Sequence, residues 1–354
     1  MRTIRITGTG SALPGRIVTN KELEQLVETS DEWIRERTGI AERHVSVGET
    51  VVTLASEAAR KALEQVGKTA EEIDLILVAT CSPEQYLPCS ACRVQAAIGA
   101  VNALAFDVNA ACSGFLFALN TADAYLRTGL AENALVIGSE VLSKLVDWTD
   151  RGSCILFGDG AGAVVVERCR TETRAVEYGN TLPEIEEKRI PAAGILGRAL
   201  HSDGAGGGVL QCGARELTTP YARTPAAKTD QNQPTDGGEH YIQMDGQEVY
   251  RFATRRVPQC IEEALSDAGL AVTDIDMFVL HQANARIIDA VAKRLHADRD
   301  KFPTNLERVG NMSSASIPVL LDELNRQRKL HRGDRIVLAG FGAGLTIGAC
   351  VMTW

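Results

Sequence analysis

The sequence predicts an α/β protein built from two related halves. Three observations support this: apolar, β-rich runs alternate with helical stretches, two distant segments resemble each other, and 354 residues suit two domains. Such alternation is typical of a largely parallel sheet covered by helices. A chain of this size can bury about 75% of its unfolded surface, so its core needs no disulfide or metal.

The predicted strands are short apolar runs bounded by turn residues. The first residues, "MRTIRITGTG", predict a strand and a turn rather than a signal or transit peptide. Further strands are predicted at "DLILVAT" (74–80), "LAFDV" (104–108), "ALVIGSE" (134–140), "AGAVVVE" (161–167), "DMFVLHQ" (276–282) and "RIVLAGF" (335–341).

An internal repeat predicts the two halves. "ALEQVGKTAEEIDLILV" (62–78) aligns without gaps on "ALSDAGLAVTDIDMFVL" (264–280), at an offset of 202 residues. A second match, at an offset of 182, pairs "GDGAGAVVV" from 158 with "GFGAGLTIG" from 340. Two matches in the same order are typical of duplication. We therefore expect one half at residues 1–171 and the other at 172–354.

The region between the repeated segments differs in composition. Residues 172–243 are rich in Gly, Pro, Thr, Asp and Gln, as in "HSDGAGGGVLQCG" (201–213) and "TPAAKTDQNQPTDGGEH" (224–240). These residues favour turns and loops. An extended loop region of this length is usually functional or mobile.

Composition excludes several classes of protein. A net charge of −9 argues against non-specific nucleic-acid binding. No run approaches the roughly 20 apolar residues of a membrane span. The nine cysteines, an odd number, fit a reducing compartment with free thiols. "CSAC" (89–92) lacks the second pair or nearby histidine of a zinc site, so we expect no metal.

One cysteine stands where a nucleophile would be useful. In "NAACSGF" (109–115), Cys112 follows a predicted strand and precedes a run with helical spacing that ends near Gly129. A helix N-terminus favours the thiolate, and the small neighbours leave space for a substrate. From the residues alone, a buried unreactive thiol is an equal alternative.

Two distant residues are candidate partners for this cysteine. His281 follows the apolar strand "DMFVL" directly, at the strand end where sites form in open α/β sheets. Asn311 lies in the small-residue turn "VGNMSSASIP" (309–318). Each alone favours a structural interpretation. Together they suggest acyl transfer: a thiolate accepts an acyl group, and neutral His and Asn donors stabilise the enolate formed when a malonyl thioester loses CO2.

With these residues in view, the chain resembles the β-ketoacyl-acyl-carrier-protein synthase III family, the condensing enzymes that begin type II fatty-acid synthesis. The resemblance rests on six collinear motifs: "DEWIRERTGI" (31–40), "AACSGF" (110–115), "DWTDRGSCILFGDGAGA" (147–163), "HQANARI" (281–287), "GNMSSASIP" (310–318) and "GFGAGLTIG" (340–348). It implies a thiolase-like fold with a layered αβαβα core, a homodimer and a cytoplasmic enzyme, or one of the plastid stroma if a transit peptide has been removed.

The resemblance also implies a role for each matching residue. Cys112 is the acylated nucleophile, and His281 and Asn311 promote malonyl decarboxylation. The backbone amides of Cys112 and Ala343 form the oxyanion hole. The residues matching the CoA and pantetheine site are Trp33, Arg37, Thr38, Arg151, Gly246, Gln247, Asn284 and Phe341. Leu87 and Phe157 match the acyl pocket, Leu87 through the partner subunit. Acyl-CoA and malonyl-acyl-carrier-protein are the implied substrates, with no separate cofactor.

A basic cluster predicts a docking surface for the acidic carrier protein. It comprises Arg251, Arg255, Arg286, Lys293 and Arg294. The alternative is a solvated helix face.

The sequence departs from the family pattern at a few positions. Met312 and Ser314 replace the usual Thr and Ala, and Ala343 interrupts a glycine run. Leu87 and Ile347 stand at positions that are often aromatic, which leaves the length of the primer open.

Alternative functions stay open at this point. They are a relative in secondary metabolism, acyl transfer without decarboxylation, a thiolase using Cys350, and a non-catalytic subunit. A dinucleotide-binding protein is disfavoured because "GTGSALPG" (8–15) lacks Gly-x-Gly-x-x-Gly spacing.

Overall fold

The computed structural model describes residues 2–170, 194–213 and 240–354. The predicted boundary between residues 171 and 172 and nearly all of the predicted loop "TPAAKTDQNQPTDGGEH" lie outside these ranges.

A five-stranded sheet forms from the first part of the chain, in the order β1-β7-β6-β4-β5. Its strands are β1 (Arg2–Ala12), β4 (Leu75–Ala79), β5 (Leu104–Val108), β6 (Asn133–Glu140) and β7 (Gly160–Arg170). Strand β4 runs parallel to β5 and β6, whereas β7 runs antiparallel to β1 and β6. The predicted turn in the first ten residues is wrong, because β1 continues through Gly8 and Gly10.

A four-stranded sheet forms from the later part, in the order β11-β12-β13-β8. Its strands are β8 (Gly194–Ser202), β11 (Met277–Leu280), β12 (Arg335–Gly342) and β13 (Thr346–Thr353). Only β11 and β12 are parallel. Both sheets are therefore mixed, and the expectation of largely parallel sheets is wrong. Strands β6 and β7, like β12 and β13, are joined without a crossover helix, which makes them antiparallel.

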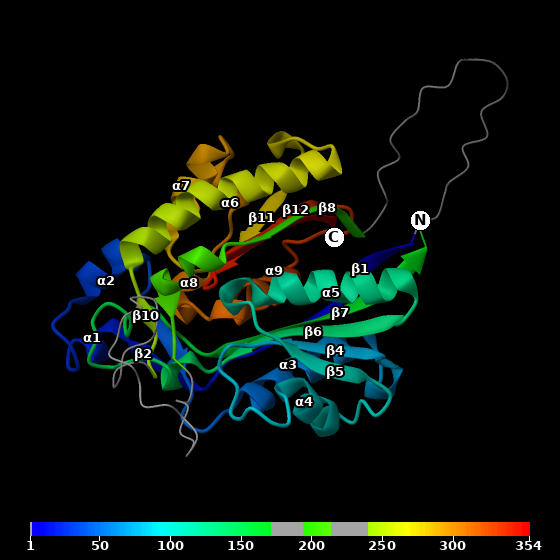
Figure 1. The fold of residues 1–354 in the computed structure, drawn as a ribbon, viewed down its shortest axis with the longest axis horizontal. Helices are drawn as coiled ribbons and strands as arrows, with labels where there is room; N and C mark the ends of the chain where they lie inside the picture. Colours follow the sequence, from blue (N-terminus) through cyan, green and yellow to red (C-terminus); the bar gives the residue numbers. More distant parts are fainter. Residues whose placement is uncertain (1, 171–193, 214–239) are drawn as a thin grey trace, which may run out of the picture.

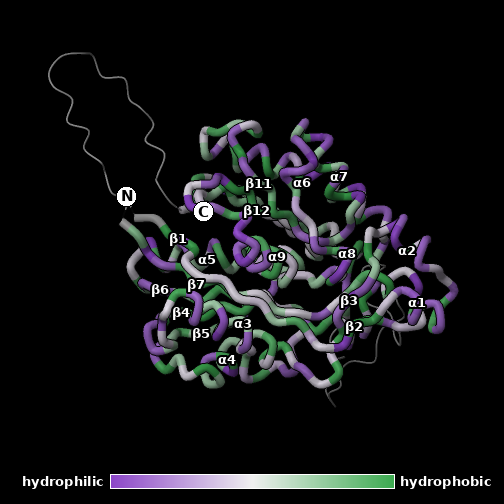
Figure 2. The backbone as a smooth tube through the Cα atoms, turned by 180° about the vertical axis from the view of Figure 1, so that it is seen from behind, coloured by the Kyte–Doolittle hydropathy of each residue, from purple (hydrophilic) through white to green (hydrophobic). Residues whose placement is uncertain are grey.

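The two sheets and three helical layers stack as α-β-α-β-α (Figure 1). Helices α3 (Val51–Val66) and α4 (Ser90–Ile98) cover the outer face of the first sheet. Helices α6 (Gly246–Ala268) and α7 (Ala285–Arg294) cover that of the second. Between the sheets lie α5 (Gly114–Thr128) and α9 (Ser316–Arg326), whose apolar side chains join both sheets in one core. In Figure 2 the hydrophobic stretches follow the strands, and hydrophilic residues gather on the outer helices. The predicted layered core is confirmed.

Smaller elements complete the fold. A two-stranded antiparallel ladder pairs β2 (Arg16–Thr19) with β3 (Glu42–Val45). The other short elements are α1 (Asn20–Leu23), α2 (Asp31–Thr38), α8 (Leu306–Val309), β9 (Leu210–Gln211) and β10 (Gln243–Met244), with 3-10 turns at η1 (Ala70–Glu72), η2 (Ala111–Ser113), η3 (Leu142–Lys144), η4 (Gly204–Val209), η5 (Val272–Asp274), η6 (Arg299–Lys301) and η7 (Ser313–Ala315). Of the predicted loop region 172–243, residues 194–213 and 240–243 are described, and they include strands β8 and β9 and the start of β10 rather than loop alone. Paired backbone outweighs its turn-rich composition there.

The first repeat match is confirmed by the structure. The order α3, η1, β4 recurs as α6, η5, β11. The side chain of Gln65 accepts from the amide of Thr9 at 2.7 Å, and that of Asp267 accepts from the amide of Arg198 at 3.0 Å. Gln65 and Asp267 lie 202 residues apart and fasten equivalent strands, β1 and β8, to equivalent helices.

The second repeat match is wrong in register. Strands β6 and β12 keep the 202-residue offset from end to end, so "GFGAG" corresponds to the end of β6 rather than to the start of β7. The connection from β6 to β7 spans residues 141–159, whereas β12 and β13 are joined by residues 343–345. The glycine-rich resemblance therefore joined segments that are not equivalent.

Buried polar contacts cross the central layer. Asp123 of α5 pairs with Arg198 of β8 at 2.7 Å, and Asp322 of α9 accepts from Thr9 of β1 at 2.8 Å. Both carboxyls are buried. Each central helix thus binds the sheet formed by the other part of the chain.

Three further expectations concern the chain as a whole. All nine cysteines are free thiols, with the sulfurs of Cys89 and Cys92 3.4 Å apart. Within residues 2–170, 194–213 and 240–354, no three His, Cys, Asp or Glu side chains are placed to hold a metal ion. In the same ranges no helix has the length and apolarity needed to cross a membrane.

Candidate active site

One cavity of about 1210 Å³ collects most of the predicted site residues. Its lining includes Trp33, Arg37, Thr38, Cys112, Phe157, Gly246, Gln247, Arg251, His281, Asn284, Arg286, Asn311 and Phe341. A second cavity of about 440 Å³ shares Cys112 and Phe157 with the first and adds an apolar wall of Leu142, Leu145 and Ile242. Cys112 therefore lies where the large cavity meets a smaller one with an apolar wall.

Cys112 occupies the 3-10 turn η2 between β5 and α5. The preceding Ala111 has φ of 45°, a left-handed conformation that is uncommon for a residue with a side chain and is typical of functional turns. The end of β12 packs directly on this turn: a Cβ at Gly342 would come within 2.6 Å of the Cys112 nitrogen. Glycine at 342 is thus needed for the close approach of the two segments.

Burial controls the ionisation of Cys112. It raises the pKa of the thiol to about 12, although the neighbouring Ser313 hydroxyl and the cysteine's own N–H act in the opposite direction. The prediction that the helix N-terminus favours a thiolate is contradicted for the free protein. A helix end contributes about 0.3–1 kcal/mol, less than one pKa unit, and the lost solvation of the thiolate outweighs it.

His281 follows β11, as predicted, and is 3% exposed. Its ring packs edge-on against Phe341, with the ring centroids 5.7 Å apart. Burial lowers the pKa of His281 to about 3, so the imidazole is neutral near pH 7. Its Nδ1 atom is buried and has no hydrogen-bond partner among the described residues.

Asn311 is held firmly at the edge of the same cavity. Its backbone N–H donates to Leu156 at 2.9 Å, and its carbonyl accepts from Gly158 at 3.0 Å. Its side-chain oxygen accepts from the amide of Ser313 at 2.9 Å. This last bond fixes the amide group so that the oxygen is engaged and the NH2 is left to act as a donor.

The turn that carries Cys112 and the turn that follows Asn311 are copies of one unit. Turns η2 and η7 lie 202 residues apart, and each contains a left-handed residue, Ala111 with φ of 45° and Ser313 with φ of 48°. In this correspondence Ser314 takes the position of Cys112. Duplication has therefore placed two equivalent turns in one site, and only one of them carries a thiol.

An aromatic–cationic cluster forms around Trp33, which lines the large cavity. Arg151 lies 5.0 Å and Arg37 5.6 Å from the ring centroid of Trp33. The hydroxyl of Thr38 donates to Ile34, and the side chain of Asn284 caps α7 and donates to Arg37. Thr38 and Asn284 therefore shape this end of the cavity through bonds within the protein.

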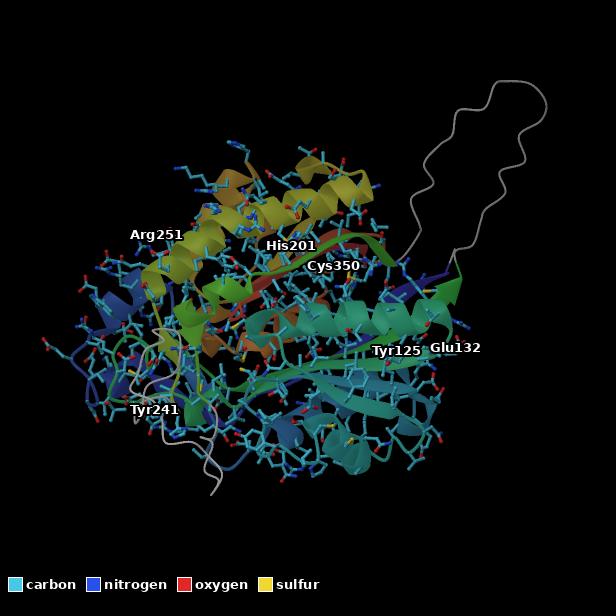
Figure 3. The ribbon with its side chains drawn as sticks, viewed as in Figure 1. Tyr125, Glu132, His201, Tyr241, Arg251 and Cys350 are labelled. Atoms are coloured by element: carbon cyan, nitrogen blue, oxygen red, sulfur yellow. The ribbon has the colours of Figure 1, made fainter. Side chains whose placement is uncertain are left out.

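The other predicted site residues are spread more widely. Ala343 borders the smaller cavity beside Cys112. Leu87 is 85% exposed and touches neither of these two cavities. Arg255, Lys293 and Arg294 are exposed on α6 and α7, outside the large cavity. Figure 3 shows Arg251 on α6, at the end of the helix nearest α2.

Sequence reasoning missed several polar residues around the thiol. The hydroxyl of Ser113 donates to the carbonyl of Ala110 at 2.9 Å and lies 2.6 Å from the hydroxyl of Thr346. Glu140, the last residue of β6, is fully buried nearby. An acidic residue ending the apolar run "ALVIGSE" was the available signal for it.

Similar proteins identify the family. Two family profiles match: 3-oxoacyl-[acyl-carrier-protein] synthase III at residues 106–180 and its C-terminal region at residues 265–354. A β-ketoacyl-[acyl-carrier-protein] synthase III of Clostridium acetobutylicum is 45% identical over 100% of this chain and 99% of its own length. The chain belongs to the β-ketoacyl-acyl-carrier-protein synthase III family. It is therefore a condensing enzyme of fatty-acid synthesis, of the acyltransferase type.

Solved structures agree with this family. A synthase III of Aquifex aeolicus has a TM-score of 0.85 and is 38% identical, covering 99% of this chain and 100% of its own. A priming β-ketosynthase from the R1128 polyketide biosynthetic pathway has a TM-score of 0.84 at 33% identity, covering 99% and 96%. The thiolase-like fold expected of synthase III is confirmed.

Proposed function

We propose that the chain condenses an acyl-CoA primer with malonyl-acyl-carrier-protein, through an acyl-enzyme formed on Cys112. The observation that carries this proposal is the meeting of Cys112, His281 and Asn311 in one cavity. A nucleophile with two neutral hydrogen-bond donors suits acyl transfer followed by enolate formation.

In the first step the sulfur of Cys112 attacks the thioester carbonyl of acyl-CoA. The C–S bond to CoA breaks, CoA leaves as a thiol with the proton that Cys112 gives up, and the acyl group remains on Cys112. The amides of Cys112 and Ala343, which both border the smaller cavity, are the proposed donors to the oxyanion. Since burial disfavours a free thiolate, the proton has to leave as the substrate binds and the attack proceeds.

In the second step malonyl-acyl-carrier-protein takes the place of CoA. His281 and the NH2 of Asn311 donate to the thioester carbonyl, loss of CO2 leaves an enolate, and its carbon attacks the acyl group on Cys112. The bond between the acyl carbon and the Cys112 sulfur then breaks, with the thiolate as leaving group, and the 3-oxoacyl-carrier protein is released. A neutral His281 is suited to this role, because it stabilises charge that develops only as CO2 departs.

The CoA end of the cavity is assigned to the cluster around Trp33. An adenine ring stacking on the indole would displace Arg151, whose guanidinium now occupies the ring face. Acyl-CoA is consumed as a substrate in this scheme, and no separate cofactor is proposed.

The carrier protein is assigned to the exposed basic residues of α6 and α7. Arg251 and Arg286 border the cavity, and Arg255, Lys293 and Arg294 extend the positive charge outward from it. An acidic carrier protein docked there would bring its thioester arm to the cavity mouth.

A homodimer is also proposed. Among the described residues, strand β5 pairs with β4 alone and lies at the edge of the first sheet. Leu104, the first residue of β5, is 53% exposed, and Leu87, shortly before α4, is 85% exposed. An edge strand and exposed apolar side chains are both suited to contact with a second copy. We place the dimer in the cytoplasm, or in the plastid stroma.

A second candidate is a priming condensation in a secondary pathway. The structural likeness to the R1128 priming β-ketosynthase favours it. It uses the same residues and differs only in the primer and in the later fate of the product.

A primer panel tests the proposed function. Acyl-CoAs from acetyl to long and branched chains are incubated with the protein and malonyl-acyl-carrier-protein, and the carrier protein is weighed by intact mass spectrometry. We expect CO2 release and a 3-oxoacyl-carrier protein with at least one primer. An acyl-carrier protein formed without CO2 release would show simple acyl transfer instead. No product and no acylated enzyme with any primer would contradict the proposal.

Removal of basic side chains should weaken carrier binding. For Arg255→Ala with Lys293→Ala we expect the KM for malonyl-acyl-carrier-protein to rise about tenfold, with kcat and acylation by acyl-CoA unchanged, because surface charges act on encounter. The effect should shrink at high salt. Lys329→Ala, an exposed lysine after α9, is the matched control. An unchanged KM would show that the carrier protein does not dock on the basic residues of α6 and α7.

A further inference from the structure

Glu140 is a buried carboxyl group with no role in the reaction described above. It ends β6, is 0% exposed, and lies between the loop after β4 and the turn after Asn311. Its partners among the described residues are hydroxyls, an amide and a thiol, and none of them is a cation. An unpaired carboxylate in such a place is costly, whereas a carboxylic acid is not.

The contacts of Ser314 locate a proton. Its hydroxyl oxygen lies 2.8 Å from the carbonyl oxygen of Ala79 and 2.8 Å from Oε1 of Glu140. A hydroxyl has one hydrogen to donate, and a carbonyl oxygen only accepts. The hydrogen of Ser314 therefore goes to Ala79, and the hydrogen between Ser314 and Glu140 has to come from Glu140.

The second oxygen of Glu140 fits the same assignment. Oε2 lies 2.5 Å from the hydroxyl of Ser82 and accepts from the amide of Cys81 at 3.1 Å. The oxygen of Ser82 in turn accepts from the amide of Val141 at 2.9 Å, so its own hydrogen is free to go to Glu140. Oε2 is thus an acceptor only, and Oε1 is the atom that carries the hydrogen.

We propose that Glu140 is protonated at neutral pH, donates to Ser314, and is a positioning residue for Cys112. As a neutral acid it joins three segments that surround the nucleophile: the loop after β4, the end of β6 and the turn η7. It does so without setting a negative charge beside the sulfur on which a thiolate must form.

The surroundings of Glu140 predict how the reactivity of Cys112 should change with pH. Burial raises the pKa of Glu140, and the ionisable groups that face it are the thiols of Cys81 and Cys112. Ionised Glu140 would in turn raise the pKa of both thiols. When Glu140 loses its proton at alkaline pH, the reaction rate of Cys112 should therefore fall below the rate expected from the rising fraction of thiolate.

Infrared spectroscopy tests the proton directly. A protonated carboxyl has a C=O stretch separate from the carboxylate bands, and most Asp and Glu side chains are ionised at pH 7. We expect this band in the native protein and its loss in Glu140→Gln. Asp159→Asn is the matched control: Asp159 is also fully buried, but its oxygens accept from the amides of Ser46 and Ser143, so no extra hydrogen is required. A band that persists in Glu140→Gln would overturn the proposal.

Alkylation of Cys112 by iodoacetamide, followed by mass mapping, tests the consequence for the nucleophile. Glutamine keeps the donor and acceptor pattern of the neutral acid, so at pH 7 the native and Glu140→Gln rates should agree within about twofold. At alkaline pH the native protein should fall behind the variant. A variant that is already several times faster at pH 7 would mean that Glu140 is ionised there, which would overturn the proposal.

The positioning role rests on the proposed function of Cys112, but the protonation does not. If Cys112 failed to accept an acyl group from any primer, the infrared result would still stand. If the infrared band were missing, acylation of Cys112 could still be observed and would still support the proposed function. The two proposals can therefore fail separately.

Discussion

Cys112→Ala should abolish both acylation by acyl-CoA and condensation, with a loss in condensing activity of at least about 10³-fold. The covalent acyl-enzyme on Cys112 cannot form without its sulfur, so both steps that depend on it should stop. Intact-protein mass after incubation with acyl-CoA measures the first step, and product formation measures both steps.

Cys81→Ala is the matched control for this experiment, because Cys81 borders the same smaller cavity as Cys112. The Cys81 variant should keep its mass gain with acyl-CoA. Full condensing activity in Cys112→Ala would show that another residue carries the acyl group. If the mass gain were lost in Cys81→Ala and kept in Cys112→Ala, Cys81 would be the nucleophile and the proposal would be wrong.

His281→Ala and Asn311→Ala should each lower condensation about 10²–10³-fold while Cys112 is still acylated. Each removes one donor to the enolate oxygen, a loss of the size found when an oxyanion donor is deleted. Single-turnover CO2 release from malonyl-acyl-carrier-protein, measured on pre-acylated enzyme, separates this step from acylation.

The neutrality of His281 adds a check on its role. Because burial holds the pKa of His281 near 3, the rate of CO2 release should show no titration of this residue between about pH 5 and 8. A rate that falls with a midpoint near that of an ordinary histidine, and that loses this dependence in His281→Ala, would show that the imidazole acts through its charged form. If His281→Ala also failed to accept an acyl group, its effect would lie in the first step.

The sequence alone predicted the parts of the fold that depend on local patterns. Apolar runs such as "DLILVAT" became buried strands, and the repeat at an offset of 202 correctly paired α3 and β4 with α6 and β11. The cavity residues Cys112, His281 and Asn311 were found because each stands at a strand end or turn next to small residues. Resemblance then supplied their proposed roles.

What the sequence could not predict depends on contacts across the fold. Strand direction in β7 and β13 is set by pairing, not by composition, so the sheets were expected to be more parallel than they are. The ionisation of Cys112 depends on how deeply the thiol is buried, which residues 109–115 do not reveal. Glu140 and Ser314 lie 174 residues apart and acquire a shared hydrogen only when the two halves meet.

The crossed contacts of the central layer have a consequence for how activity can be lost. Cys112 lies between β5 of the first sheet and α5, His281 follows β11 of the second sheet, and Asn311 precedes α9. Catalysis therefore depends on how these segments are aligned. Asp123 with Arg198 and Asp322 with Thr9 hold that alignment from buried positions remote from the cavity. Loss of these buried contacts would therefore abolish activity by misaligning the two parts of the site, although Cys112, His281 and Asn311 would all still be present.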